Sequence, residues 1–153
     1  MANFVEELVD DLVTQTIAAT KGTDIFYNEL PEESDLTPAT LVVLKDSGGI
    51  PSPDIPLPQT SVQILVRSSE SWIAARAKAS EIFNRYHGSL GLTTTSYKIL
   101  HGAATQMPAD VGVDERGRYR VGFNVMFEVM LLTQDEGDDG EGYGGGKDLY
   151  DPF

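Results

Sequence analysis

Residues 59–83, QTSVQILVRSSESWIAARAKASEIF, change halfway along from a repeat of two to a helical repeat. The first half predicts a strand over 61–67, because apolar residues alternate there with a mixed set that includes Gln63 and Arg67. We do not expect this mixed face to lie in the deep core. The second half is rich in alanine, which favours a helix and lets it approach a sheet closely.

The helix in this stretch has a start signal and a stop signal. Ser68 or Ser69 suits the N-terminal cap, and Gly88 suits a left-handed helix end. A histidine at the end of a helix, as at His87, is well explained by its interaction with the helix dipole. Neither His87 nor His101 has neighbours in sequence that mark it as a general base.

The longest alternation lies at 119–131, YRVGFNVMFEVML, where every second residue from Tyr119 is apolar. This predicts a strand with one apolar face and one mixed face. At about 3.4 Å per residue the strand would be roughly 45 Å long. That exceeds the ~35–40 Å diameter expected for the body of such a domain. We therefore expect either a bulge at Gly122 or a strand end that projects toward another subunit.

The remaining elements are shorter. Residues 3–19 have the apolar spacing of a helix, and residues 24–28, 40–44 and 97–100 are typical of strands. The segment 40–44 is apolar on both faces, which predicts a central strand. The predicted class is α+β, with a small mixed or antiparallel sheet packed against two helices. The predicted order is α-β-β-β-α-β-β in a single domain over 1–133, followed by a flexible acidic C-terminal tail.

Charge is distributed unevenly along the chain, whose net charge is −13. Residues 1–54 hold eleven acidic and two basic side chains, residues 61–120 eight basic and five acidic, and residues 134–153 seven acidic and one basic. Such opposed blocks fit self-association at least as well as solvated faces without a partner. The glycine-rich tail over 134–153 cannot build a core, although Tyr150 and Phe153 could anchor it on a neighbouring protein.

Signals for catalysis, metal binding or membrane insertion are missing from the sequence. There is no cysteine, and no nucleophile-elbow, phosphate-loop or zinc-protease motif. The segment DEGDDG at 135–140 fails the ligand pattern of a calcium loop. Residues 1–12 are acidic, unlike a secretory signal, and no apolar run approaches the ~20 residues of a membrane helix. We expect no enzyme, no cofactor and no membrane partner.

One family resemblance adds to this interpretation. Residues 28–88 carry Leu30-Pro31, then Gly48-Gly49 among prolines, then the strand VQILVR at 62–67 and a helix with spaced alanines at 74–86. This order resembles the bacteriophage minor capsid or tail-terminator (tail-completion) family. The resemblance extends over roughly residues 1–133 in the order of elements and is sharpest over residues 28–88.

The resemblance implies a virion structural protein rather than an enzyme. It implies a ring of identical subunits, typically a hexamer, that caps the tail tube and joins it to the head connector. The expected partners are further copies of the chain, the tail tube protein and the connector protein, with DNA passing through the lumen without specific binding. The expected location is the head-proximal end of the virion tail, after assembly in the host cytoplasm.

Contacts in such a ring would explain the polar side chains on the mixed strand faces. A ring of identical subunits needs two different complementary patches on each subunit. The candidate interface residues are Gln63, Arg67, Arg118, Arg120, Tyr150 and Phe153. A head-completion or connector protein at the head–tail interface remains an alternative, and a small catalytic or ligand-binding α/β domain is a more distant one.

Overall fold

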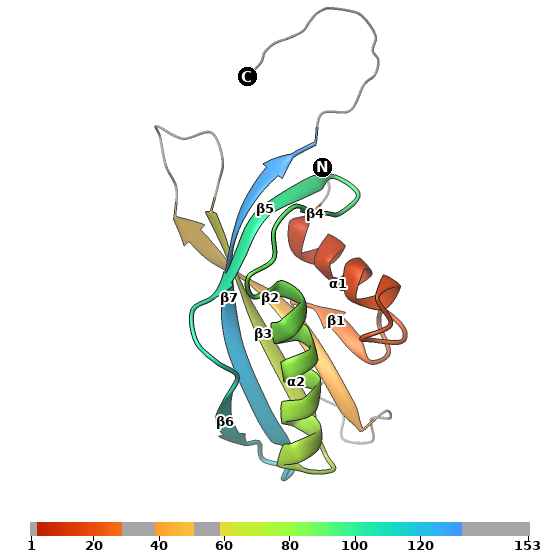
Figure 1. The fold of residues 1–153 in the computed structure, drawn as a ribbon. Coiled ribbons are helices and arrows are strands. Elements are labelled where there is room, and N and C mark those ends of the chain that lie inside the picture. Colours follow the sequence, from red (N-terminus) through yellow and green to blue (C-terminus); the bar gives the residue numbers. More distant parts are fainter. Residues whose placement is uncertain (1–2, 29–38, 51–58, 133–153) are drawn as a thin grey trace, which may run out of the picture.

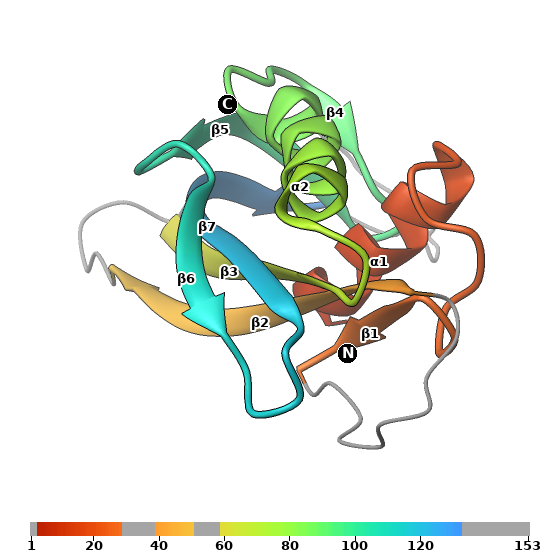
Figure 2. The same cartoon turned by 90° about the horizontal axis from the view of Figure 1, so that it is seen from below.

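One seven-stranded sheet organises the fold, and two helices pack on the same face of it (Figures 1 and 2). The computed structural model describes residues 3–28, 39–50 and 59–132. The elements in chain order are α1 (Phe4–Thr14), β1 (Ile25–Tyr27), β2 (Thr40–Ile50), β3 (Gln59–Ser68), α2 (Trp72–Tyr86), β4 (Leu92–Thr93), β5 (Tyr97–Ala104), β6 (Ala109–Val113) and β7 (Tyr119–Leu131).

The strand order is β1-β2-β3-β7-β5-β4, and β6 pairs with β7 off this path. The pair β1–β2 is parallel and the other pairs are antiparallel, so the sheet is mixed. The predicted mixed α+β domain with two helices is confirmed. The predicted order of elements lacks the short strands β4 and β6. The predicted acidic tail over 134–153 lies outside the described residues.

The strand predicted at 40–44 is longer than expected but has the predicted character. It pairs with β1 on one side and β3 on the other, and residues 41–44 are buried on both faces of the sheet. The strand predicted at 61–67 begins two residues earlier and ends one residue later, as β3.

The strand β7 has the predicted bounds, and the bulge at Gly122, one of the two predicted alternatives, is absent. Its register with β3 is unbroken from Tyr119 to Glu128. Residues 129–131 extend beyond β3 and pair with β5, so the end of the strand is held within the chain. The other side of β7 is shared between β6 and β5, whose own register shifts absorb the irregularity. The length of β7 is accommodated because two shorter strands, β6 and β5, pair with successive parts of the side that faces away from β3.

Local hydrogen bonds set the helix bounds. Asn3 caps α1, because its Oδ1 accepts hydrogen bonds from the backbone N–H of Val5 at 2.9 Å and of Glu6 at 3.2 Å. The helix ends at Thr14 rather than near residue 19, and Thr16 takes a left-handed conformation with φ of 59°.

The start of α2 differs from the prediction. Ser71 is the N-terminal cap, and its Oγ accepts a hydrogen bond from Ala74 N–H at 3.0 Å. Ser68 is the last residue of β3, and its Oγ instead accepts a hydrogen bond from Glu70 N–H. The serine-rich turn therefore places the helix two to three residues later than expected.

The core lies between the sheet and the two helices. One cluster of buried apolar side chains joins α1, α2 and the inward faces of β2, β3, β5 and β7. Phe127 on β7 makes edge-to-face contacts with Phe4 of α1 and Tyr86 of α2, so both helices meet on the same strand. Ala75 and Ala79 are fully buried, as expected for alanines that allow a close helix–sheet approach.

Candidate assembly surface

The face of the sheet opposite α1 and α2 carries the mixed residues of β2, β3 and β7. Among the described residues, both helices pack on the other face (Figure 2). Cross-strand pairing arranges the mixed residues in rows. Lys45, Gln63 and Asn124 form one row, and Leu41, Arg67 and Arg120 form another. We call this side of the sheet the open face.

Gln63, Arg67 and Arg120 are therefore brought to one face, as the repeat of two predicts. Gln63 is exposed, whereas Arg67 keeps only 6% of its surface exposed. The expectation that the mixed face lies outside the deep core holds at Gln63 and is wrong at Arg67. Leu41 and Val43 are also buried on this face, so its polarity changes along the strands.

Arg67 and Arg120 lie directly opposite each other across the β3–β7 pair. Burial lowers the pKa of Arg67, the nearby charge of Arg118 lowers it further, and Asp114 acts in the opposite direction. Like charges opposite each other in a sheet disfavour folding by themselves. The arrangement concentrates three guanidinium groups at the end of the sheet where β6 and β7 meet.

The turn between β6 and β7 holds Arg118 within the subunit. Arg118 Nε donates to Asp114 Oδ2 at 2.7 Å, and the side chains of both residues are mostly buried. Asp114 Oδ1 also accepts the backbone N–H of Arg116 and of Arg118. Burial would raise the pKa of Asp114, but these hydrogen bonds and the charge of Arg118 lower it below its usual value.

Arg120 contacts the neighbouring strand β6. Its Nη2 donates to the carbonyl oxygen of Val111 at 3.3 Å. Its Nε is buried and has no acceptor within the described part of the chain. Tyr150 and Phe153, the other two predicted interface residues, lie outside the described residues.

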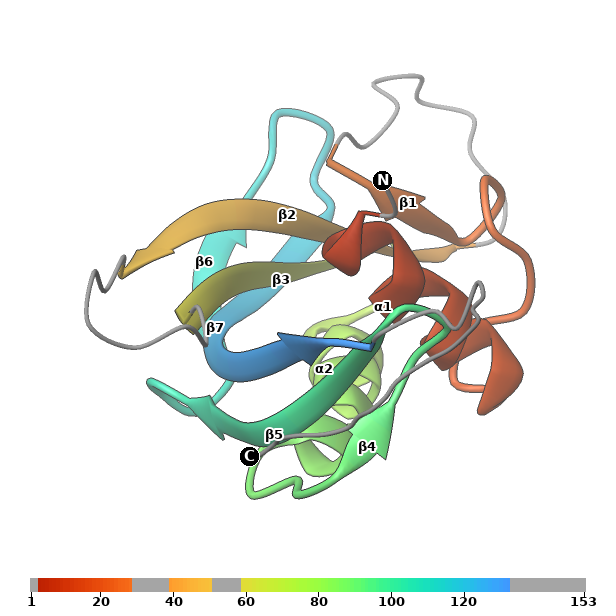
Figure 3. The ribbon, with the colours of Figure 1, turned by 90° about the horizontal axis from the view of Figure 1, so that it is seen from above.

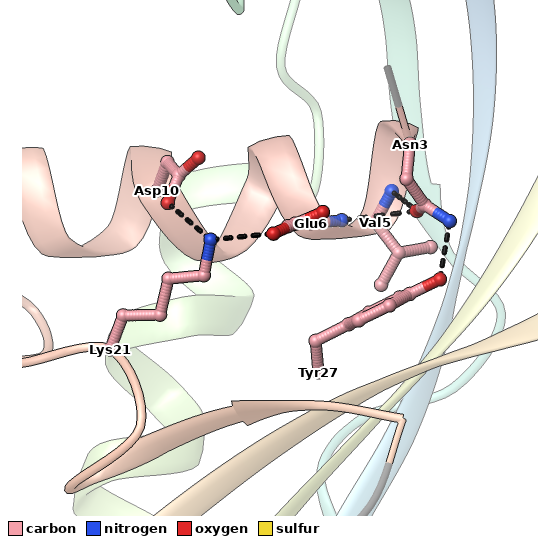
Figure 4. A network of polar contacts seen from close by, with 6 residues as sticks. All are labelled: Asn3, Val5, Glu6, Asp10, Lys21 and Tyr27. Atoms are coloured by element: carbon pink, nitrogen blue, oxygen red, sulfur yellow. Dashed lines mark hydrogen bonds and ion pairs between the residues drawn. The ribbon is translucent and has the colours of Figure 1, made fainter. Parts of the chain in front are cut away.

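Several acidic residues of the N-terminal block are paired inside the chain. Lys21 Nζ lies 2.8 Å from Glu6 Oε2 and 3.3 Å from Asp10 Oδ1, on the outer side of α1 (Figure 4). In the same view, Asn3 Nδ2 donates to the hydroxyl of Tyr27, which joins the start of α1 to β1. These exposed pairs anchor the helix to the segment that follows it.

Asp11 joins the two helices. Its carboxylate accepts two hydrogen bonds from the guanidinium of Arg85, at 3.1 Å and 2.8 Å, and one from the Tyr86 hydroxyl at 2.8 Å. Burial raises the pKa of Tyr86 well above its usual value, and the adjacent carboxylate adds to the shift. Sequence reasoning missed this contact, because partners more than seventy positions apart leave no local signal.

Glu7 joins α1 to the β4–β5 hairpin, which lies beside it in Figure 3. Its Oε1 accepts hydrogen bonds from Thr94 Oγ1 at 2.6 Å and from Ser96 N–H at 2.8 Å. A hollow lined by residues of α1, the end of α2 and this hairpin lies next to these contacts. Within residues 3–28, 39–50 and 59–132, no group of His, Cys, Asp and Glu side chains has the arrangement of a metal site.

Neither histidine has contacts, within the described residues, that indicate a catalytic role. His87 Nδ1 accepts the backbone N–H of Ala104 at 3.0 Å, and its ring stacks on Phe83. His101 lies exposed within β5, opposite Glu128 of β7. None of the helices that the structure describes is long and apolar enough to cross a membrane.

Comparison with known proteins gives one family match. The family model described as "Bacteriophage tail terminator protein" matches residues 12–129. A search of curated protein sequences finds no significant match. Among solved structures, a chain from the virion of a native gene transfer agent particle is similar in fold, with a TM-score of 0.55 and 16% identity over 81% of this chain and 89% of that one. A second solved chain has a TM-score of 0.50 and 12% identity, over 86% of this chain and 93% of its own length.

Proposed function

Because this chain belongs to the bacteriophage tail terminator family, we propose that it forms a ring that caps the tail tube and joins the tube to the head connector. A structural role in a phage tail follows from the family. The family match over residues 12–129 is the observation that carries the proposal, and it spans α2, most of the sheet and the last turn of α1.

The proposed assembly is a homo-oligomeric ring, most simply a hexamer. Closed rings of identical subunits use two different patches on each subunit. The open face of the sheet, with Gln63 exposed and Lys45 and Asn124 beside it, is one candidate patch. Arg67, Arg118 and Arg120 lie at the β6 end of the same sheet, where Asp114 pairs with Arg118.

The partners in this proposal are the tail tube protein on one side of the ring and the connector protein on the other. DNA passes through the lumen without specific binding, since a net charge of −13 repels the phosphate backbone. The location is the head-proximal end of the virion tail, and assembly takes place in the host cytoplasm. The proposal assigns the chain no catalytic step.

Residues 134–153 act in this proposal as an interaction arm, with Tyr150 and Phe153 as its anchors. The two aromatic side chains follow a glycine-rich acidic stretch. Such a composition lets a segment span a gap before its apolar end binds. The arm and the open face together are the proposed contact surfaces of the ring.

The test is native mass spectrometry of the full chain, alone and with purified tail tubes, followed by electron microscopy of the mixture. We expect rings of defined mass at the ends of tubes. A chain that stays monomeric both in solution and on tubes contradicts the ring. Rings that bind isolated connectors but never tube ends favour a head-completion role instead.

A further inference from the structure

The edges of the sheet are closed to different degrees. On the β1 edge, the turn at residues 21–22 covers the strand, because Gly22 N–H donates to the carbonyl of Ile25 at 2.8 Å. On the β5 edge, β4 covers residues 98–99, and backbone hydrogen bonds from the segment after α2 engage Gly102. The chain itself therefore covers residues 42–44 of β2 and residues 98–102 of β5, while the later part of β2 pairs with β3 alone among the described residues.

The outer side of β6 is different. Within the part of the chain that the structure describes, this strand pairs with β7 alone. Val111 and Val113 are 46% and 48% exposed, and Met107, just before the strand, is 70% exposed. Soluble proteins usually protect an open edge with lysine or proline, and an exposed apolar edge marks a site of strand addition.

The edge can accept only a short strand. β6 has five residues, and its register shifts between Asp110 and Gly112. The N–H of Gly112 is already taken by the Asp110 carboxylate at 2.7 Å. An added segment of about five residues with apolar side chains would match this edge, because the exposed side chains of Val111 and Val113 are apolar.

The chain contains one such segment outside the described residues. Residues 147–151, KDLYD, place Leu149 and Tyr150 between two aspartates, and Pro152 follows, where a strand must stop. Polar and glycine residues dominate 133–146, a composition typical of linkers.

Distance favours binding to another copy of the chain. β7 runs from its β6-paired end near Arg120 to Leu131, eleven residues away or roughly 37 Å at ~3.4 Å per residue. A flexible linker of about 14 residues has a root-mean-square length of only about 20 Å. To reach its own β6, the linker would have to be stretched to most of its ~46 Å limit.

We propose that the edge of β6 in one subunit receives residues 147–151 of a neighbouring copy as an added strand. Leu149 and Tyr150 then cover the exposed valines. This inference rests on the self-association in the proposed function, because a neighbouring copy must be present, and it names the binding site of the arm.

The test uses introduced cysteines, since the chain has none of its own. Val111→Cys and Tyr150→Cys are made in two chains of different mass, mixed under conditions of assembly and oxidised mildly. We expect a disulfide-linked heterodimer. The matched control pairs Tyr150→Cys with Thr14→Cys, an exposed position on α1, and should give several-fold less product. Adding Val113→Lys to the Val111→Cys chain should reduce the cross-link several-fold while the circular dichroism spectrum stays unchanged.

Native masses recorded on the same mixtures separate the two proposals. Rings without a cross-link between positions 111 and 150 overturn strand addition and leave the ring intact. Cross-linked pairs without rings support strand addition and contradict ring closure. A double variant that forms the disulfide only within one chain shows that the segment folds back on its own β6, and this overturns the binding to a neighbour.

Discussion

The two faces of β7 differ sharply although their residues alternate along one strand. On the helix side, Phe123 and Phe127 are at most 2% exposed and pack against rings from both helices. On the open face, Asn124, Met126 and Glu128 remain partly exposed. The helix side holds the subunit together, whereas the open face has capacity for contacts that the described part of the subunit does not use.

Truncating the helix side should have the largest effect. Phe127→Ala removes a fully buried ring that contacts Phe4 and Tyr86, and we expect a loss of about 3–5 kcal/mol in the free energy of unfolding. Met126→Ala, the next residue but on the open face, should cost about 1 kcal/mol or less. Urea unfolding of both variants measures the difference. Equal losses would show that the two faces are equally buried in the protein in solution.

Much of this comparison is readable from the sequence. The unbroken alternation at 119–131 predicts both the bounds of β7 and its buried side, because a repeat of two assigns residues to faces directly. The strand β6 is not predictable in this way. Its sequence, ADVGV, holds a glycine and an aspartate that disfavour a strand, and its pairing with the distant strand β7 stabilises it.

The candidate surface is predictable only in part. Sequence places Gln63, Arg67 and Arg120 on mixed faces, and pairing of β3 with β7 brings them to the same side. It does not predict that Arg67 is buried, because burial depends on the register of neighbouring strands. Nor does it predict that Arg118 is paired with Asp114, since that contact depends on the turn between β6 and β7.

Loss of the polar contacts between α1 and α2 should have the second-largest effect on stability. Asp11→Ala removes the acceptor of Arg85 and Tyr86 and leaves a largely buried guanidinium without its partner, at a cost of about 2–3 kcal/mol. Asp10→Ala is the matched control, because its contact with Lys21 is exposed and should contribute about 0–1 kcal/mol. Thermal unfolding of the two variants at neutral pH tests the ranking. A control variant as destabilised as Asp11→Ala would contradict it.

The hydrogen bonds of Glu7 should make the stability of the protein sensitive to acid. Burial would raise the pKa of Glu7, but hydrogen bonds from Thr94 and Ser96 lower it below the usual 4.5. A lowered pKa in the folded state adds stability above pH ~4.5 that is lost as the pH falls through the folded value.

The variant that tests this is Glu7→Gln, which keeps an oxygen acceptor but removes the charge. We expect it to be about 1 kcal/mol less stable than the native chain at neutral pH, because hydrogen bonds to a charged group are stronger. The two unfolding free energies should converge below pH ~4.5. A constant difference across chemical denaturation curves from pH 3 to pH 7 would show that the charge of Glu7 contributes nothing.

The smallest effect on stability is expected at Gln63, an exposed residue on the open face. Its side chain is exposed between Lys45 and Asn124, so Gln63→Ala should change the free energy of unfolding by about 0.5 kcal/mol or less. If the open face contacts a neighbouring subunit or the tube, Gln63→Glu should weaken assembly while leaving stability almost unchanged, because it adds a charge that the partner must desolvate. Native mass spectrometry at several concentrations, beside the unfolding curve of the same variant, measures both quantities. Assembly that is unchanged in both variants would remove Gln63 from the contact surface and leave the β6 end of the sheet, with its exposed valines and Arg116, to carry the contact.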